Sequence, residues 1–392
     1  MERKRAFGVL LLDMSAAFNL CCKSILVPKL KLLGLTDCAA ELINSYLTDR
    51  RNLTKVGGRT SRMVPVPTGI GEGSVLGPLI FLVAILETSE VMMRVRKTVK
   101  RRHNQQLEGM EMRTICFADD TTLVCSAEDD IQLEILMRVC SEEYTKYFKV
   151  CGMKINKDKE EHYVILPGGT KIMDREIEID GRKPAETVKL LGLTIGPRYS
   201  FDHHVSKSVQ KVSMKLAHVR RLRKILSDKK MKEVTESLIM SSLKFGLEWS
   251  ARTDNNMKRL QVMMNQVLRL LMKSGRQMSI RLMLARTNMM NISLEAKMMR
   301  MTLMKRVLSM GSTPLTNSYV IFPGHRSRSG DLRSRLPSGK FGQSSILNIS
   351  IELLNSVNFW KMRDDEGKYP SKQVFKTKVK EFLKANFSNG NL

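Results

Sequence analysis

The sequence predicts an α+β fold: an antiparallel sheet backed by helices, followed by an all-helical region. Two observations carry this prediction. Short β-prone runs at residues 8–13 and 114–125 alternate with amphipathic helical segments in the first 200 residues. From about residue 203 to residue 310 the apolar pattern becomes purely helical. With 392 residues and 42% hydrophobic content, the chain is long enough for two domains that each have a core.

The N-terminal elements follow from their apolar runs and their end signals. Gly8–Asp13 predicts a buried strand that ends in a carboxylate. Lys23–Leu33 predicts a helix that stops at Gly34, and Thr36-Asp37 can cap a second helix. Residues 52–68 are punctuated by Gly and Pro, which is typical of a hairpin or loop.

The next segment contains a glycine-rich turn and a hairpin. Gly69–Ser74 forms the turn, which opens an apolar helix from about Leu76 to Met92. The basic segment Arg94–Gln106 is interpreted as a loop. Thr114–Cys125 holds two β-prone runs with two acids at their junction, which predicts a hairpin with carboxylates at its tip.

A long helix is predicted after the hairpin, because five residues recur at spacings of three and four: Leu133, Leu136, Cys140, Tyr144 and Tyr147. Short strands follow at about 162–166, 176–179 and 188–195. Thirteen of the 27 methionines lie between residues 257 and 310, where their helical spacing indicates an adaptable core. A short amphipathic helix, about Lys372–Asn386, closes the chain.

The charge is unevenly distributed and suggests the domain organisation. Residues 1–200 hold 30 basic and 26 acidic side chains, whereas residues 201–310 hold 23 and 7, a net charge of +16. Such an excess favours contact with a nucleic-acid backbone over a membrane surface, and few aromatic residues are present for base stacking. We therefore predict domains at 1–200 and 201–310. Residues 311–345, rich in Ser, Gly, Pro and Arg, are a predicted linker, and 346–392 a short helical segment.

Several classes of protein are disfavoured. The longest apolar run, Val75–Ile85, is about half the length needed to span a bilayer, and the N-terminus lacks the apolar region of a secretory signal. The seven cysteines show no C-x-x-C spacing and no cluster with histidine, so a disulfide framework or a zinc site is not expected. We expect no membrane partner and an intracellular protein.

Three aspartates carry the chemical signal. Asp13 ends one predicted strand, and Asp119 and Asp120 lie at the hairpin tip about a hundred residues later. Adjacent carboxylates repel one another, so a cation is needed to keep both ionised. Oxygen ligands select hard divalent ions such as Mg²⁺, and two such ions can clamp the oxygens of a phosphoryl transfer. Taken alone, an Asp-Asp pair after a strand more often caps a turn.

Three segments stand in order around these acids: Leu12–Asn19 (LDMSAAFN), Gly69–Pro78 (GIGEGSVLGP) and Cys116–Thr121 (CFADDT). They resemble successive palm motifs of reverse transcriptases from non-LTR retrotransposons, the jockey-like kind in particular. Two more resemble the following lysine motif and the primer-grip strand pair: Gly152–Lys159 and Val188–Ile195. Ser45–Arg50 and Leu260–Arg269 resemble segments outside the catalytic motifs. The resemblance covers roughly residues 8–310.

The resemblance implies a palm followed by an all-helical thumb, with roles for single residues. Asp13 and Asp119 would hold two Mg²⁺ ions, Asp120 would complete the acidic cluster, and the backbone carbonyl of Met14 would be a further metal ligand. Lys159 would be a candidate proton donor to the pyrophosphate leaving group, although surface lysines are common. The basic helices would grip the template–primer backbone without reading bases.

The resemblance also implies a nucleotide site. Phe18 would stand under the sugar of the incoming nucleotide and exclude a 2′-hydroxyl; a plain core phenylalanine fits the sequence equally well. The Gly73-Ser74 turn would let the backbone approach the nascent base pair, and Ser74 can equally cap a helix. Glu72 stands in the same turn.

Some positions depart from the family pattern. Asn19 replaces the usual Asp, Lys23 stands where a His is usual, and Gly71-Glu72 replaces Pro-Gln. Glu72 would place negative charge near a triphosphate unless its side chain turns away. Phe117 replaces the frequent Tyr. The fingers and any endonuclease are expected upstream of Met1, so the chain is interpreted as a palm and thumb truncated at the N-terminus.

These observations predict an RNA-directed DNA polymerase that binds an RNA template, a DNA primer and deoxynucleoside triphosphates. The alternative is a catalytically inactive remnant that binds nucleic acid through its basic helices. A viral RNA-dependent RNA polymerase shares the palm, but Phe18 argues against it through the predicted sugar selection. The resemblance implies a ribonucleoprotein in the nucleus and cytoplasm, and the sequence does not indicate an oligomeric state.

Overall fold

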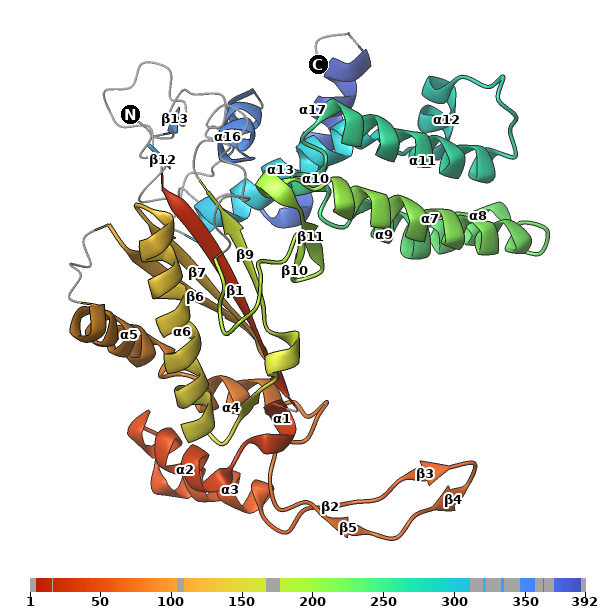
Figure 1. The fold of residues 1–392 in the computed structure, drawn as a ribbon. Coiled ribbons are helices and arrows are strands. Elements are labelled where there is room, and N and C mark those ends of the chain that lie inside the picture. Colours follow the sequence, from red (N-terminus) through yellow and green to blue (C-terminus); the bar gives the residue numbers. More distant parts are fainter. Residues whose placement is uncertain are drawn as a thin grey trace. The chain divides into compact units, whose positions relative to one another are not determined.

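The computed structural model describes most of the chain and divides it into two compact units. The described residues are 5–15, 17–103, 109–166, 177–310, 320–321, 333–334, 346–356, 362 and 370–388. Unit 1 comprises Met1–Val188 and Pro197–Tyr199, and unit 2 comprises Lys189–Gly196 and Ser200–Leu392. Figure 1 shows the elements of both units.

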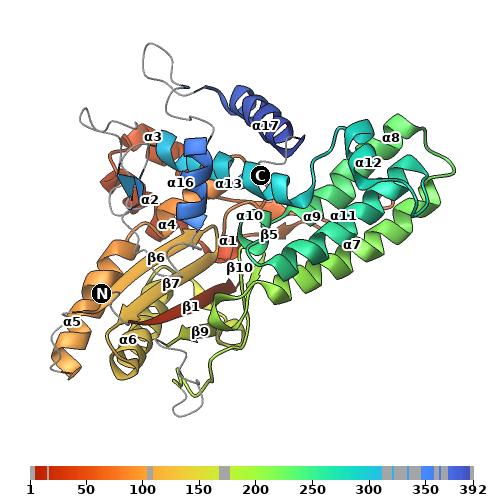
Figure 2. The same ribbon diagram turned by 90° about the horizontal axis from the view of Figure 1, so that it is seen from above.

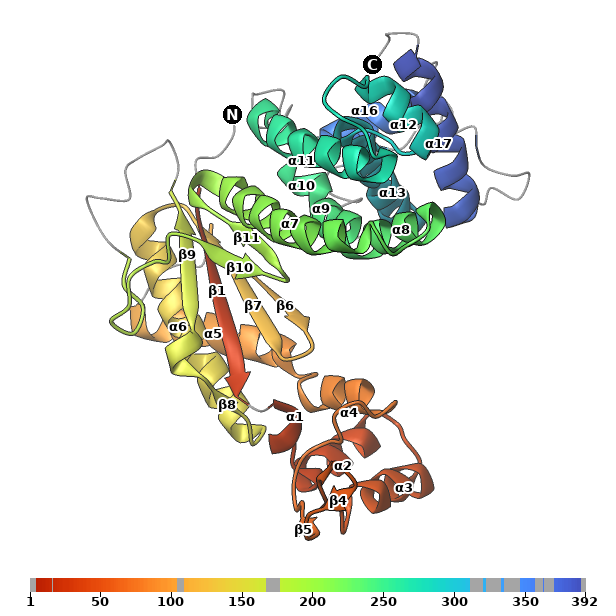
Figure 3. The ribbon, with the colours of Figure 1, turned by 90° about the vertical axis from the view of Figure 1, so that its right-hand side faces the viewer.

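Unit 1 is built on an antiparallel sheet whose central strand is β1 (Ala6–Ser15). On one side of β1 lies β7 (Asp120–Ala127), which pairs in turn with β6 (Glu111–Phe117). On the other side β1 pairs with β9 (Glu161–Ile165) and, at its C-terminal end, with β8 (Lys154–Ile155) (Figure 3). The predicted strand and hairpin are therefore confirmed, and β9 confirms the strand at 162–166.

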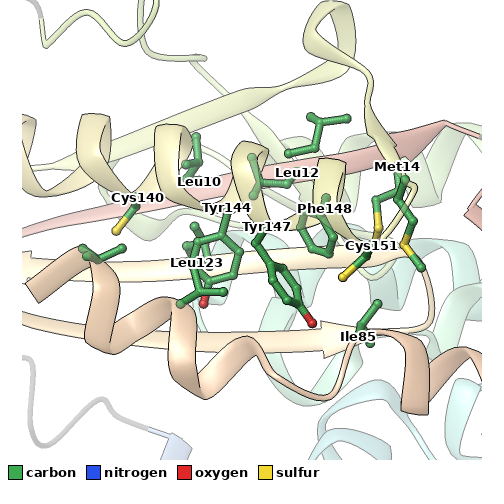
Figure 4. Close-up of a cluster of buried hydrophobic side chains, with 14 of the residues drawn as sticks. Leu10, Leu12, Met14, Ile85, Leu123, Cys140, Tyr144, Tyr147, Phe148 and Cys151 are labelled. Atoms are coloured by element: carbon green, nitrogen blue, oxygen red, sulfur yellow. The ribbon is translucent and has the colours of Figure 1, made fainter. Parts of the chain in front are cut away.

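Helices cover one face of this sheet. Side chains alternate between the two faces of each strand, so every second residue of β1 faces these helices. Even-numbered residues of β1 point toward α5 (Thr88–His103) and α6 (Asp130–Val150), which lie together on that face (Figure 2). Figure 4 shows the resulting core, in which Leu10 and Leu12 pack with Leu123 against aromatic residues of α6. All five residues that predicted α6 are buried, so this helix is confirmed.

The opposite face of the sheet is more open. It carries the odd-numbered residues of β1 and the residues opposite them on β6 and β7. Three of its large apolar side chains remain substantially exposed: Phe7 at 44%, Ile115 at 50% and Phe117 at 64%. The acidic residues discussed below share this open face.

The segment between β1 and β6 is mostly helical. It contains α1 (Ala17–Leu20), α2 (Lys23–Leu32), α3 (Asp37–Leu47) and α4 (Gly77–Ala84). As predicted, α2 ends before Gly34, and the Thr36 side chain accepts a hydrogen bond from the Ala39 amide at the start of α3. Of the hairpin or loop predicted at 52–68, the structure has the hairpin. It contains four two-residue strands: β2 (Arg51–Asn52), β3 (Lys55–Val56), β4 (Arg59–Thr60) and β5 (Val64–Pro65).

Two predictions about the following helices were wrong. The apolar helix expected from Leu76 to Met92 breaks after Ala84, where Lys29 Nζ donates to the Ala84 carbonyl at 2.9 Å and so satisfies the end of α4. The segment expected as a loop from Arg94 is helical as far as His103, and 104–106 lie outside the described residues. It is helical because three valines spaced four residues apart are fully buried: Val91, Val95 and Val99.

The strand expected at 176–179 does not form within the described residues 177–179. Ile179 and Arg182 exchange backbone hydrogen bonds across a tight turn, which leaves a single bridge rather than a strand. The strands expected at 188–195 are confirmed as the hairpin of β10 (Val188–Leu190) and β11 (Leu193–Ile195). Short 3₁₀ turns lie at η1 (Lys157–Lys159) and η3 (Pro197–Tyr199).

Unit 2 is helical from residue 202 to residue 309, as predicted for about 203–310. Its first helices are α7 (Asp202–Leu222), α8 (Asp228–Val234), the π-helical η4 (Thr235–Met240), α9 (Ser241–Lys244) and α10 (Leu247–Ser250). The later ones are α11 (Asp254–Met272), α12 (Ile280–Thr287), α13 (Ile292–Ser309), α16 (Ile346–Ser356) and α17 (Lys372–Ser388). The predicted C-terminal helix is α17.

Methionines contribute strongly to the unit 2 core, as their spacing predicted. Met263, Met264 and Met283 are buried between α7, α11 and α12, and Met301 and Met304 pack against α16 and α17. Nearly all of the predicted linker at 311–345 lies outside the described residues, apart from β12 (Val320–Ile321) and β13 (Arg333–Ser334). Within the described residues, no helix has the length and apolar character required to cross a bilayer.

Candidate active site

Two of the three predicted aspartates face one another across paired strands. Asp13 lies near the C-terminal end of β1, directly opposite Asp120 at the start of β7. Residues at opposed positions of antiparallel strands project from the same face with Cβ atoms about 5 Å apart. Asp119 precedes Asp120 in the two-residue turn of the β6–β7 hairpin, where Ala118 has a φ of 51°. The structure therefore brings all three acids to one edge of the open face.

The backbone of β1 changes partners beside these acids. The Asp13 carbonyl accepts a hydrogen bond from the Asn156 amide at 2.8 Å, on the side of β1 that faces β8. Successive carbonyls of a strand point to opposite sides, so the carbonyl of Met14 is directed toward the side that carries β7 and its hairpin. The predicted ligand atom of Met14 thus lies on the side where Asp119 is located.

Lys159 reaches the same acids from η1. Its Nζ lies 3.4 Å from Asp13 Oδ2, and its side chain is 67% exposed. The ammonium group partly offsets the repulsion that two opposed carboxylates would otherwise experience. The structure therefore brings together Lys159 and Asp13, which are separated by most of unit 1 in the sequence.

A polar network holds the segment that carries Lys159. Lys157 Nζ bonds Glu160 at 2.8 Å and Asp180 at 2.9 Å, and the buried Ser141 hydroxyl donates to Glu160 at 2.7 Å. Burial acts to lower the pKa of Lys157, but its bonds to the two carboxylates outweigh burial and raise that pKa. Lys157 therefore remains a cation that fixes the turn before β9.

The donor set has the chemistry that a divalent ion requires. Three carboxylates and a backbone carbonyl offer oxygen ligands only, which suits Mg²⁺. In the conformation described, however, no three His, Cys, Asp or Glu side chains among the described residues form a group that could hold a metal ion. The residues fit such an ion by type and by strand register.

Phe18 lies on α1, directly after the acidic end of β1, and one face of its ring packs against Phe81. Its ring stacks on the fully buried ring of Phe81, with centroids 4.8 Å apart and planes inclined by 21°. Its backbone carbonyl accepts a hydrogen bond from the Ile70 amide at 2.7 Å. The ring thus has one packed face, and the side chain is partly exposed.

The glycine-rich turn is clamped onto the backbone of α1. The Gly69 amide donates to the Cys21 carbonyl at 2.8 Å, and Thr68 Oγ1 donates to the Asn19 carbonyl at 3.1 Å. Arg50 Nη1 donates to the Gly69 carbonyl. A Cβ at Gly69 would lie 2.7 Å from the Asn19 Cα and carbonyl oxygen, and its φ is +91°, so only glycine fits.

The two main departures from the family pattern contact each other. Asn19 Nδ2 donates to Glu72 Oε1 at 3.2 Å. The carboxylate of Glu72 is therefore directed toward Asn19 on α1, and its orientation relative to a triphosphate stays a prediction. The pair also exchanges chemical roles relative to the usual Asp and Gln, because the amide is now on residue 19 and the carboxylate on residue 72.

The rest of the turn has a structural role. Ser74 Oγ accepts a hydrogen bond from the Gly77 amide at 3.1 Å, which satisfies the first amide of α4. The N-cap residue of α4 is Leu76, so the predicted N-cap by Ser74 is wrong in position. Gly73 has a φ of +78°, and a Cβ there would meet nothing within 4 Å. Open space therefore lies beside Gly73, and its role as a close-approach position stays a prediction.

Two supporting residues were missed in the sequence. In the sequence, Phe81 is one member of an apolar run. Nothing in the local sequence indicates that its ring stacks on Phe18 rather than on another core residue. Arg50 ended the Ser45–Arg50 segment, which was recognised but given no role. Both act through contacts between segments that are distant in the sequence, and such contacts leave no periodic pattern.

Comparison with known proteins identifies the domain. A family model described as reverse transcriptase (RNA-dependent DNA polymerase) matches residues 1–195. Residues 1–195, about half of the chain, therefore match the reverse transcriptase family. Reverse transcriptases generally use divalent metal ions, which agrees with the oxygen-rich edge of the sheet. The predicted fold class, an antiparallel palm followed by a helical thumb, is confirmed.

Curated relatives narrow the family. Two matches are to retrovirus-related Pol polyproteins from the type-1 retrotransposable element R2 of Popillia japonica. One is 26% identical over 204 residues, covering 48% of this chain and 31% of the relative; the other is 24% identical over 169 residues, covering 43% and 22%. The predicted kinship with non-LTR retrotransposons is confirmed, and the jockey-like assignment stays a prediction. The chain spans less than a third of each relative.

Solved structures give weaker likenesses. Telomerase from Candida albicans, in complex with a fragment of telomeric RNA, matches 73% of this chain and 50% of its own, with 12% identity and a TM-score of 0.38. Apo telomerase from Candida tropicalis matches 78% of this chain and 52% of its own, with 13% identity and a TM-score of 0.32.

Proposed function

We propose that this chain is the polymerase part of a retrotransposon reverse transcriptase, which adds deoxynucleotides to a DNA primer on an RNA template. One observation carries the proposal: the strand register places Asp13 opposite Asp120, with Asp119 beside it at the hairpin turn. Opposed carboxylates on one face repel each other, and divalent cations bound by them would relieve that repulsion.

The roles proposed for the side chains follow the geometry. Asp13, Asp119, Asp120 and the Met14 carbonyl would hold two Mg²⁺ ions, which when bound stabilise the charge that develops in phosphoryl transfer. Lys159, at 3.4 Å from Asp13, would donate a proton to the departing pyrophosphate. Phe18 would close the nucleotide site below the sugar, since Phe81 prevents its ring from yielding.

Unit 2 would hold the template–primer by its backbone. Residues 201–310 carry 23 basic and 7 acidic side chains. Within this unit, a pocket of 490 Å³ is lined by Lys189, Lys207 and Lys211, together with hydroxyl groups of α7 and α9. Lys189 belongs to the predicted primer-grip hairpin. Lysine and hydroxyl donors of this kind suit phosphate oxygens, which favours grip without base readout.

The alternative of an inactive binding remnant is not favoured, because the reverse transcriptase family model covers residues 1–195 and the motif residues Asp13, Asp119, Asp120 and Lys159 are all present. We propose the domain boundaries given above, and a ribonucleoprotein in the nucleus and cytoplasm, on the strength of the resemblance.

Primer extension on poly(rA)/oligo(dT) with Mg²⁺ and dTTP tests the proposal. We expect incorporation by the full chain, and none above background by the Asp119→Ala variant. Equal incorporation by the two proteins would refute the assignment of the acids. Preferential incorporation of rUTP over dTTP would instead favour an RNA polymerase and remove the proposed role of Phe18.

A further inference from the structure

Three arginines converge on one pocket in unit 2, at the end of α7 and α11 that is remote from β10 and β11. The pocket has a volume of 580 Å³. Arg220 comes from the last turn of α7, Arg269 from the last turn of α11, and Arg276 from the loop that follows α11. Figure 1 shows the two helices side by side within this unit. Gln266 and Ser274 add polar groups to the lining.

The positive charge of this pocket is not compensated by the protein. No acidic residue lines it, and no described carboxylate pairs with Arg220, Arg269 or Arg276. The acid near this end of the helices, Asp228, is already paired with Arg223 at 2.7 Å and with Lys273 at 3.8 Å. Three guanidinium groups that share one cavity without a counterion repel each other, which an anion would relieve.

One of these groups also has an unmet hydrogen bond. Arg269 Nε is buried and has no hydrogen-bond partner among the described residues. A buried donor without a partner costs roughly 1–3 kcal/mol, so native proteins keep few of them without a functional reason. An acceptor that enters the pocket would satisfy it.

Helix capping does not account for Arg269. The carbonyls at the end of α11 are already served by Arg223, whose Nε donates to the Leu270 carbonyl at 3.2 Å and whose Nη2 donates to the Leu271 carbonyl at 3.1 Å. The Ser274 amide donates to the carbonyl of Arg269 itself. The guanidinium of Arg269 is thus not needed to hydrogen-bond the last carbonyls of the helix, which is the usual structural role of an arginine at a helix C-terminus.

We propose that this pocket binds a backbone phosphate of the template–primer, at a site separate from the lysine pocket beside β10 and β11. Guanidinium groups match phosphate oxygens through paired N–H donors, and a buried Nε makes this match directional. A polynucleotide is favoured over a small anion because the surrounding unit carries a net charge of +16 over residues 201–310. The inference rests on the proposed binding of nucleic acid, but not on polymerisation.

Salt dependence of binding tests the site. The full chain and its Arg269→Gln variant are titrated with a fluorescent RNA–DNA template–primer between 50 and 200 mM salt, roughly the range over which phosphate contacts are resolved. Arg96→Gln is the matched control, since Arg96 is exposed on α5 of unit 1, outside the basic region 201–310, and does not line the pocket. We expect R269Q to weaken binding severalfold and to lower the log–log slope by about one, with R96Q close to wild type.

Further variants separate the possible outcomes. Arg276→Gln lies in an exposed loop, so it should reproduce the change in slope even if R269Q is unstable. Equal slopes for R269Q, R276Q and R96Q would overturn the inference. Stabilisation of the wild type, but not R269Q, by inorganic phosphate, without any change in template–primer binding, would overturn the polynucleotide assignment. Failure of primer extension with an arginine-dependent slope would refute the proposed polymerase and leave the site standing.

Discussion

A methyl group at Gly69 would press the glycine turn against α1. The added Cβ would lie 2.7 Å from the Asn19 Cα and carbonyl oxygen, whereas ordinary contact begins at 3.4 Å. The two segments would therefore separate by about 0.7 Å, which strains backbone that the Ile70 and Gly69 amides hold in place. Because Phe18 and Asn19 lie on the displaced segment, the nucleotide site would move with them.

The size of the effect can be divided into two parts. An alanine at a φ of +91° costs about 1 kcal/mol in conformational strain. The close contact adds a further 1–3 kcal/mol, about the cost of overpacking, for a total of about 2–4 kcal/mol. Gly34 provides a matched control, because its φ is +92° but nothing lies within 4 Å of an added Cβ. Gly34→Ala should therefore show only the strain.

Urea denaturation and single-nucleotide incorporation measure the two consequences. We expect Gly69→Ala to lower the free energy of unfolding by at least about 1 kcal/mol more than Gly34→Ala. The KM for dTTP should rise severalfold in G69A and remain unchanged in G34A. Equal losses of stability, or an unchanged KM in G69A, would refute the reasoning that this contact positions the nucleotide site.

Three further predictions concern other contacts of unit 1. Asn19→Asp would place two carboxylates opposite each other at the 3.2 Å contact with Glu72, so the rate of primer extension should fall roughly tenfold, an effect of about 1.4 kcal/mol. The rate should recover in the double variant N19D/E72Q, and no recovery would show that the two residues are not coupled. Lys157→Met would leave the Glu160 carboxylate, whose side chain is 4% exposed, buried without its cation. Urea denaturation should therefore show a free energy of unfolding lower by roughly 3 kcal/mol, and a decrease under about 1 kcal/mol would contradict the role of the network. Burial lowers the pKa of His162 below 6.5, so the unfolded state takes up a proton before the folded state does, and stability should fall as the pH drops below about 6.5. That fall, followed by urea midpoints, should be smaller in His162→Gln, and an identical pH profile would exclude this contribution.

The sequence predicted those parts of the fold that depend on local pattern. The long helix α6 and the β6–β7 hairpin each carry a strong periodic signal and clear end signals, so their existence and type were predicted correctly. The second half of helix α5 was missed because its buried face consists mainly of one row of valines, Val91, Val95 and Val99. The arginines and lysines between these valines give the segment the composition of a loop. A narrow stripe is recognised only once the sheet that it covers is known.

The same distinction applies to the site. The acids Asp13, Asp119 and Asp120 were found because each follows an apolar strand, and their grouping follows from strand register. The contact between Asn19 and Glu72 could not be predicted, since 53 residues separate them and only the folding of the glycine turn onto α1 brings them together. Each residue appeared as an unexplained departure, and the structure shows that they are partners.

Single-turnover incorporation of dTMP tests the central claim most directly. Wild type, Asp119→Asn and the control Asp130→Asn, an acid in the first turn of α6, are compared at saturating template–primer with Mg²⁺. The account predicts that D119N binds the template–primer as tightly as wild type but loses at least about a thousandfold in rate, with D130N unchanged. A rate for D119N within tenfold of wild type, at equal binding, would contradict the assignment of these aspartates to catalysis.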